Sequence, residues 1–330
     1  MLIRMAKRLA RGLTHLAPRR MRKRLVVCAY HGLTPAPLAV RDWCFLDVES
    51  FRQQVEHLRR HFELLSLSEA VRRLEHGGLE GPTAVLTFDD GFRSVHDLAF
   101  PVLETLRAPA TVFLVTGLLD TDDTIWFCRL HQALSTADRR RLVWDGESFD
   151  LGDPEATAGS SATLQARLKR LPAPQLAEAV DGIVRALGGC PGEPLAEDSP
   201  YRILSRGMVR AMARSGLVEF GAHTVSHAIL RPLAAPQRQF EVRHSLAAVE
   251  RATGRPCELF AYANGRAEDY DADAVQLLRE CGVRAAVTMI EGSNDADTPL
   301  LELRRIGAGP GMTMDDFAGL LVRARSGAPG

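Results

Sequence analysis

A strand-length apolar run that ends in two carboxylates constrains this chain most. Residues Thr83–Phe88 are apolar or β-branched, as in a parallel strand buried on both faces, and Asp89, Asp90 and Gly91 follow directly. Successive strand side chains point to opposite faces, so both carboxylates reach one site only if the strand end curls, which Gly91 permits. A cation would keep one aspartate ionised as a ligand and leave the other as a base. The alternative is a solvated turn with an aspartate as helix cap.

Strand-like and helix-like segments alternate along the chain. Strands are expected at residues 24–32, 63–67, 83–88, 110–115, 217–220, 258–262 and 283–289, and helices at 45–62, 67–75, 92–106, 208–215, 236–253, 271–280 and 313–323. This alternation with short connections predicts a parallel sheet or barrel. The 330 residues suit one α/β barrel of roughly 250 residues plus an insertion.

A pair of histidines follows the strand expected at 217–220. His223 and His227 are four residues apart, so one helical turn would place both imidazoles on the same side. Two imidazoles and one carboxylate suit a zinc-like divalent ion with an open position for water. A single histidine on a helix is usually structural, but this pair accompanies an Asp-Asp strand end, which favours a metal site.

Three motifs, at residues 87–91, 223–227 and 260–265, resemble in this order the first three motifs of the polysaccharide deacetylase family, the carbohydrate esterases of the NodB-homology type. The similarity extends from about residue 25 to residue 306. It implies an α/β fold of the distorted, incomplete (β/α) barrel type. By matching position it implies Asp89 as general base and Asp90, His223 and His227 as ligands of a divalent metal ion. Zinc is the first expectation, with cobalt, nickel or manganese as alternatives.

The resemblance also suggests a general acid. No histidine follows His244, so the C-terminal Leu-x-His motif of many family members is missing. A subgroup resembling the poly-N-acetylglucosamine deacetylases has an early Tyr-His instead, which Tyr30 and His31 match. His31 would end the first barrel strand and is therefore the candidate acid, and the alternative is a structural hydrogen bond to a loop.

Three further site residues are implied by matching positions. In the third motif, the backbone N–H of Tyr262 would help to hold an oxyanion, and Asn264 beside it is a candidate contact to the substrate or the oxyanion. Ala263 stands where the family usually has proline. Arg305 falls where related sequences place an arginine near the catalytic aspartate, so it would orient Asp89 and lower its pKa; a surface ion pair is the alternative.

The β/α pattern breaks between residues 117 and 200, which predicts a largely helical insertion on the site-bearing side of the barrel. Residues 143–151 suggest a hairpin, 159–161 a linker, and 164–187 a helix. The insertion would be a lid or substrate platform with Trp126 stacked on a sugar, or Trp126 would anchor the insertion to the barrel. The chain is therefore expected to divide into a basic amphipathic N-terminal helix at 1–23, a deacetylase-like barrel of 24–116 and 201–325, and an insertion of 117–200.

Charge is unevenly distributed although the net charge is zero. Ten basic residues precede the first acidic one, Asp42, and residues 1–16 have the pattern of an amphipathic basic helix. This helix would contact an anionic membrane surface, or pack on the barrel with its charges solvated. Six scattered cysteines without a Cys-x-x-Cys pair, and no transmembrane or signal segment, favour a cytoplasmic setting, with peripheral contact at the inner membrane face as an extension.

The resemblance to this family implies a metal-dependent hydrolase that removes N-acetyl groups from an amino sugar in a polysaccharide, an oligosaccharide or a lipid-linked glycan. One alternative is a deformylase or other amidohydrolase that acts on a lipid-linked sugar, and another is a catalytically silent glycan-binding barrel. Nucleic acid is not an expected partner, because no aromatic-basic interleaving accompanies the basic arm.

Overall fold

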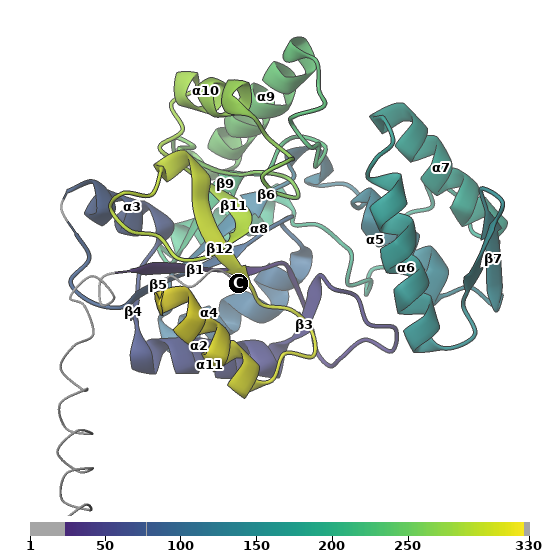
Figure 1. Ribbon diagram of the computed structural model, residues 1–330, viewed down its shortest axis with the longest axis horizontal. Helices are drawn as coiled ribbons and strands as arrows, with labels where there is room; N and C mark the ends of the chain where they lie inside the picture. Colours follow the sequence, from purple (N-terminus) through teal and green to yellow (C-terminus); the bar gives the residue numbers. More distant parts are fainter. Residues whose placement is uncertain (1–23, 77, 327–330) are drawn as a thin grey trace, which may run out of the picture.

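The computed structural model describes residues 24–76 and 78–326 (Figure 1). Its centre is a closed barrel of seven parallel strands, in the order β1-β12-β11-β10-β9-β6-β5, and the pairing of β5 with β1 closes the ring. The barrel strands are β1 (Leu25–Tyr30), β5 (Thr83–Phe88), β6 (Ala110–Leu114), β9 (Val218–Ala222), β10 (Leu259–Ala261), β11 (Ala285–Glu291) and β12 (Leu303–Gly307).

Smaller strands extend this framework. Strand β4 (Glu63–Leu64) pairs with the start of β5, and β2 (Gly32–Thr34) pairs with β3 (Phe45–Asp47) in a separate two-stranded sheet. The predicted distorted, incomplete (β/α) barrel is confirmed, since its ring has one strand fewer than a full eight-stranded barrel.

Helices surround the barrel and connect its strands (Figure 1). They are α2 (Val48–His61), α3 (Leu67–Glu75), η2 (Val95–Ala99), α4 (Phe100–Leu106), η3 (Thr116–Leu118), α8 (Arg206–Arg214), α9 (Ala235–Thr253), α10 (Ala272–Glu280), η4 (Leu300–Glu302) and α11 (Met314–Ser326).

The strands are buried on both faces, and their alternating side chains enter two hydrophobic clusters. In β1, Leu25 and Val27 join the cluster that fills the barrel, whereas Val26 and Cys28 join the larger cluster under the surrounding helices. The same alternation continues in β5, where Val85 belongs to the interior cluster. Asp89 lies an even number of residues after Val85, so its side chain points to the same, interior face of the barrel.

Two helices differ from their predicted limits. The helix expected at 45–62 begins at Val48, because residues Phe45–Asp47 pair with β2 and Asp47 caps the helix by accepting a 2.9 Å hydrogen bond from the Ser50 N–H. The segment expected as one kinked helix at 92–106 contains the π-helical turn η2 directly before α4. Pro101 has no N–H to donate, which accounts for the altered turn.

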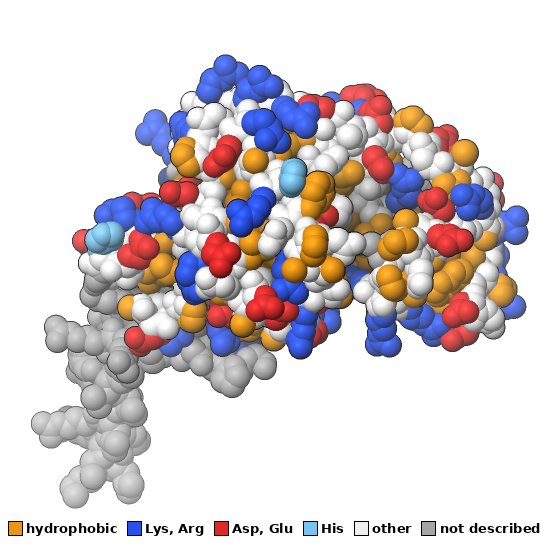
Figure 2. Space-filling model, turned by 90° about the horizontal axis from the view of Figure 1, so that it is seen from above, with side chains coloured by type: hydrophobic (Ala, Val, Ile, Leu, Met, Phe, Trp, Pro, Cys, Tyr) orange, Lys and Arg blue, Asp and Glu red, His pale blue; other side chains and the backbone are white. Residues whose placement is uncertain are grey.

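The segment between β6 and α8 forms a separate helical unit beside the barrel, drawn in teal in Figure 1. It contains α5 (Trp126–Ser135), the hairpin of β7 (Arg141–Trp144) and β8 (Glu147–Asp150), α6 (Pro154–Leu168) and α7 (Ala173–Ala186). Its apolar residues, such as Leu134, Phe149, Leu164 and Ile183, pack in their own cluster. Charged side chains of both signs lie on its surface in Figure 2.

The linker predicted at 159–161 is wrong. These residues lie inside α6, where Ser161 is buried and its hydroxyl lies 2.9 Å from Nδ1 of His131 and accepts a 3.1 Å hydrogen bond from Gln165. Small polar residues resemble a linker in sequence, but here they allow close packing of α6 on α5. The single helix expected at 164–187 is likewise wrong, because α6 ends at Leu168 and Pro172 precedes α7.

The basic amphipathic helix predicted at 1–23 lies outside the described residues. Within residues 24–76 and 78–326, no helix combines the length and apolar character needed to cross a lipid bilayer.

Candidate metal centre and catalytic site

The end of β5 curls so that both of its aspartates face one site. Asp90 and Gly91 have positive φ values of 70° and 73°, and the Gly91 N–H donates a 2.8 Å hydrogen bond back to the carbonyl of Asp89. Both aspartates are buried. The left-handed conformation costs a non-glycine residue about 1–3 kcal/mol, and strain of this kind concentrates at functional sites.

The histidine pair is held by a loop, which differs from the predicted helical turn. His223 follows the last residue of β9, and the chain then turns through Thr224 at φ 66° and His227 at φ 59°. These two left-handed residues exclude a regular helix, yet they bring both imidazoles to one side. The prediction that the spacing places both imidazoles on one side is therefore right, but the helical turn expected between them is wrong.

Glu241 of α9 fixes this loop, and sequence reasoning missed it. Its carboxylate accepts hydrogen bonds from the N–H groups of Val225 (2.7 Å) and Ser226 (3.0 Å) and from the Ser226 hydroxyl (2.7 Å). The Thr224 hydroxyl closes the turn by accepting a 3.0 Å bond from the Ala228 N–H. A glutamate in a helix gives no local signal for this role, because its partners lie some fifteen residues earlier in the chain.

Asp90, His223 and His227 each offer one ligand atom, and these atoms lie within 4.8 Å of one another. Nε2 lies 3.6 Å from Asp90 Oδ1 in His223 and 3.4 Å in His227. Nδ1 of His223 donates a 2.8 Å hydrogen bond to the carbonyl of Ala261, which leaves the Nε2 lone pair directed at the cluster.

The charge environment of this cluster fits a divalent cation. Both carboxylate oxygens of Asp90 are buried without a hydrogen-bond partner, which is costly unless a cation binds them. Burial, and then the charge of Asp89, raises the pKa of Asp90 well above its usual range. Burial also lowers the pKa values of His223 and His227, so both imidazoles are available as neutral ligands. One carboxylate and two imidazoles form a donor set typical of zinc.

Asp89 is held by Arg305 inside the barrel. The guanidinium donates two hydrogen bonds to the carboxylate, at 2.7 Å to Oδ1 and 2.6 Å to Oδ2. It also donates to Thr87 Oγ1 and to the carbonyl of Thr288, and only 1% of Arg305 is exposed, which separates it from an ordinary surface ion pair. Burial alone would raise the pKa of Asp89, but the charges of Arg305 and His223 hold it below its usual value.

His31 lies beside Asp89 at the end of the neighbouring strand. The Asp89 N–H donates a 2.9 Å hydrogen bond to the carbonyl of Tyr30, which places residue 31 next to the site. The imidazole contacts the Trp43 ring edge to face, with ring centres 5.0 Å apart. Burial lowers the pKa of His31 to about 4, although the charge of Asp89 opposes this shift.

The expected role of the Tyr262 backbone is wrong for this structure. Its N–H donates a 3.2 Å hydrogen bond to the carbonyl of Val287 on the neighbouring strand, so it is not free to bind an oxyanion. Its hydroxyl donates to the carbonyl of Leu301, and its ring stacks on Tyr270 at 4.3 Å. Tyr262 is therefore a buried packing residue at the end of β10.

Asn264 connects the barrel to the insertion. Its Oδ1 accepts a 3.0 Å hydrogen bond from Lys169 at the end of α6, and its Nδ2 donates a 2.6 Å bond to Asp269. Asn264 itself is left-handed, with φ 62°. Lys169 was not predicted, because a lysine at a helix end is usually solvated. Burial, and then the charge of Arg266, lowers the pKa of Lys169.

Trp126, the predicted stacking residue, lies at the start of α5. It is half-buried and packs against both the barrel cluster and the insertion cluster. Its ring contacts Phe127 edge to face at 5.6 Å. These contacts favour the alternative in which Trp126 anchors the insertion.

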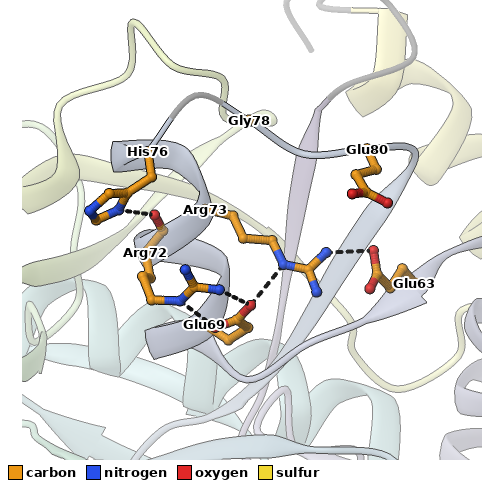
Figure 3. A pocket seen from close by; sticks show the side chains of 7 residues that line it. All are labelled: Glu63, Glu69, Arg72, Arg73, His76, Gly78 and Glu80. Atoms are coloured by element: carbon orange, nitrogen blue, oxygen red, sulfur yellow. Dashed lines mark hydrogen bonds and ion pairs between the residues drawn. The ribbon is translucent and has the colours of Figure 1, made fainter.

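A hollow in the surface lies at the end of the barrel opposite to the metal cluster, where β5 begins (Figure 3). Several of its charged groups pair with each other: Glu69 accepts hydrogen bonds from Arg72 and Arg73, and Arg73 also donates to Glu63. Glu80 also lines this hollow but is exposed to solvent, and within residues 24–76 and 78–326 only Asp90, His223 and His227 form a group of side chains that could hold a metal ion.

A family model matches the part of the chain that contains most of these residues. The model described as "Polysaccharide deacetylase" matches residues 76–167 and 183–286, which include Asp89, Asp90, His223, His227 and Asn264. Among curated proteins, the poly-beta-1,6-N-acetyl-D-glucosamine N-deacetylase of Staphylococcus epidermidis is 31% identical over 99 residues. This match covers 30% of the chain and 34% of that relative.

Solved structures show the same fold at low sequence identity. The deacetylase PplD of Streptococcus pyogenes, in complex with acetate, aligns with a TM-score of 0.60 and 18% identity over 91% of this chain and 99% of its own. IcaB from Ammonifex degensii aligns with a TM-score of 0.57 and 19% identity, over 92% and 97%. The de-N-acetylase from Aggregatibacter actinomycetemcomitans aligns with a TM-score of 0.56 and 14% identity, over 90% and 99%.

Proposed function

Because the chain belongs to the polysaccharide deacetylase family, we propose that it is a metal-dependent hydrolase that removes N-acetyl groups from an amino sugar in a glycan. The observation that carries this proposal is the cluster of Asp90, His223 and His227 beside Asp89, which Arg305 holds in place. A glycan-binding barrel without activity would not need a second carboxylate, outside the ligand set, next to the metal ligands.

Asp90, His223 and His227 would hold the cation, and zinc agrees best with one oxygen and two nitrogen ligands. When bound, a divalent cation would lower the pKa of a water molecule and polarise the amide carbonyl. Glu241 and the carbonyl of Ala261 would keep the two imidazoles in position.

Asp89 is the proposed general base. Since its pKa is held below the usual value, the carboxylate is ionised at neutral pH and would accept a hydrogen bond from the attacking water. As the water oxygen bonds to the carbonyl carbon, its proton passes to Asp89. Arg305 fixes both carboxylate oxygens, so the acceptor does not rotate away from that proton.

His31 is the proposed general acid. With a pKa of about 4, the imidazole is neutral at pH 7, so the proton that it delivers must first reach it from the water by way of Asp89. The carbon–nitrogen bond then breaks as the nitrogen takes this proton, which yields a free amine and acetic acid, and the acid ionises to acetate. Without that proton the leaving group would be an amide anion, and the intermediate would return to substrate.

The developing oxyanion requires a donor in addition to the cation. The backbone N–H of Asn264 is our candidate in place of Tyr262. It follows β10 at the carboxyl end of the barrel, and no residue within the described part of the chain accepts a hydrogen bond from it. The division into a barrel of 24–116 and 201–325 with an insertion of 117–200 remains part of the same proposal.

The substrate class is the open choice in this proposal. The Staphylococcus relative is named for poly-β-1,6-N-acetylglucosamine, which favours an N-acetylglucosamine polymer here. The basic helix predicted at 1–16 is the feature that favours a lipid-linked glycan and a peripheral membrane contact. A deformylase that acts on such a sugar would share every catalytic residue.

Acetate and formate release across a panel of N-acylated sugars and oligosaccharides, with and without chelator, distinguishes these substrates. Chelator-sensitive acetate release supports the proposal, and release of neither acid by any member of the panel contradicts it.

A further inference from the structure

Trp43 is a large apolar side chain exposed at the site. It lies in the loop between β2 and β3, which extends from the barrel towards α6 (Figure 1), and 45% of it is exposed. The indole is nevertheless held firmly: its Nε1–H donates a 3.0 Å hydrogen bond to Gln165 of α6, and its ring packs on Phe127 with centres 5.5 Å apart. A rigid, exposed indole beside His31 has the properties of a ligand-binding surface.

Lys169 lies next to this indole. Its Nζ is 5.9 Å from the centre of the Trp43 ring and 3.0 Å from Asn264 Oδ1. An ammonium has three hydrogen-bond donors, and Asn264 accepts one of them. Among the described residues the Lys169 ammonium donates one hydrogen bond, to Asn264, and forms no ion pair, so its other two donors are available to a ligand.

We propose that Trp43 and Lys169 form a subsite that binds a sugar ring of an N-acetylhexosamine oligomer at the entrance to the metal centre. The apolar face of a pyranose ring packs on the indole, and the ring's hydroxyl or carbonyl oxygens accept hydrogen bonds from the ammonium. This inference rests on the proposed function, since it assigns the substrate contacts of the same site.

The positive charge of Lys169 gives the subsite a preference. Deacetylation converts a neutral amide into an amine, which is protonated at neutral pH and therefore repelled by a nearby ammonium. A ring that keeps its acetyl group binds without this repulsion. The subsite thus favours N-acetylglucosamine oligomers over their deacetylated counterparts and helps release the product.

Binding measurements on a chain that does not turn over test this proposal. The parent is the full chain with Asp89→Asn, titrated by calorimetry with N-acetylglucosamine tetramers in β-1,4 and β-1,6 linkage and with the corresponding glucosamine tetramers. Added to this parent, Trp43→Ala should weaken binding of at least one acetylated tetramer about tenfold, and Trp43→Phe much less. Lys169→Met should reduce the preference for the acetylated over the deacetylated tetramer. Trp144→Phe, in the hairpin of the insertion, is the control for Trp43→Phe and should leave the affinities for the acetylated and the deacetylated tetramers unchanged.

If the Trp43→Ala variant binds both acetylated tetramers as tightly as its parent and its melting temperature is unchanged, the subsite is refuted. It is also refuted if the parent binds neither of the two acetylated tetramers. An undiminished preference in the Lys169→Met variant would remove Lys169 from it. Acetate release by the wild type is scored separately. A chain that binds the tetramers through Trp43 but releases no acetate refutes the hydrolase, while release without any effect of Trp43 refutes the subsite alone.

Discussion

Arg305 donates two hydrogen bonds to the carboxylate of Asp89, at 2.7 and 2.6 Å, at the carboxyl end of the barrel, where neither residue is more than 2% exposed. A bidentate, buried pair fixes both the position and the protonation state of the carboxylate. The other aspartate of the pair, Asp90, has no such partner and is left to a cation. Two adjacent residues of one type therefore acquire different chemistry from their surroundings.

Replacing Arg305 by lysine tests this relationship. Lysine keeps the positive charge but lacks the two parallel N–H donors of the guanidinium. The ionised form of Asp89 is therefore less stabilised, while burial still raises the pKa of Asp89. Because Asp89 acts in its ionised form, the acidic limb of the profile of kcat/KM against pH should move to higher pH, and the rate at pH 7 should fall. Arg304→Lys, at the exposed neighbour, is the control. An acidic limb at the same pH in both variants would show that Arg305 does not set the state of Asp89.

Glu241→Gln should weaken metal binding although residue 241 touches no metal ligand. A glutamine offers one acceptor oxygen where the carboxylate serves three donors, so the loop between His223 and His227 becomes less ordered. We expect the dissociation constant for zinc, measured by competition with a chromogenic chelator, to rise about 10- to 100-fold. Glu250→Gln on the same helix makes the same charge change away from the loop and should have little effect. Equal zinc affinities in the two variants would count against this role.

His31→Ala should slow hydrolysis of the amide about 10²- to 10⁴-fold while the metal content stays the same. The loss should be much smaller on an acetyl ester with a nitrophenolate leaving group, since that group departs without a proton. His76→Ala, at the exposed end of α3, is the control. An equal loss on amide and ester would mean that His31 acts through structure and not as the acid.

Trp126→Ala should act on stability. The indole packs against both hydrophobic clusters, so its removal should lower the free energy of unfolding in urea by about 3 kcal/mol and leave KM for an oligosaccharide nearly unchanged. Val143→Ala, at a residue that is 65% exposed in the same insertion, should change stability by less than about 0.5 kcal/mol. If stability is unaltered and KM is raised, Trp126 contacts the substrate and does not anchor the insertion.

The barrel and the residues of the metal cluster were predictable because their signals are local. A run of strand length that ends in Asp89 and Asp90 shows its character within nine residues, and the alternation of strands and helices repeats this information along the chain. The spacing of His223 and His227 was informative even though a loop, and not a helix, realises it. Arg305 was found by the resemblance to a family.

The supporting residues were not predictable, because their partners are distant in sequence. Trp43 meets Gln165 across 122 positions and Lys169 meets Asn264 across 95, so no periodicity or motif connects them. Tyr262 was misassigned because pattern alone does not tell which backbone N–H groups the neighbouring strand already uses. Such contacts follow from the tertiary fold.

In the proposed mechanism three side chains hold a cation, and a fourth, Asp89, activates water beside it. The most direct measurement compares metal content and acetate release from an N-acetylglucosamine oligomer for the wild type, Asp89→Asn and His223→Ala. This mechanism predicts chelator-sensitive release by the wild type, bound metal with at least about a hundredfold slower release for Asp89→Asn, and loss of both for His223→Ala. Release by Asp89→Asn at nearly the wild-type rate, or wild-type release that chelator leaves intact, would contradict it.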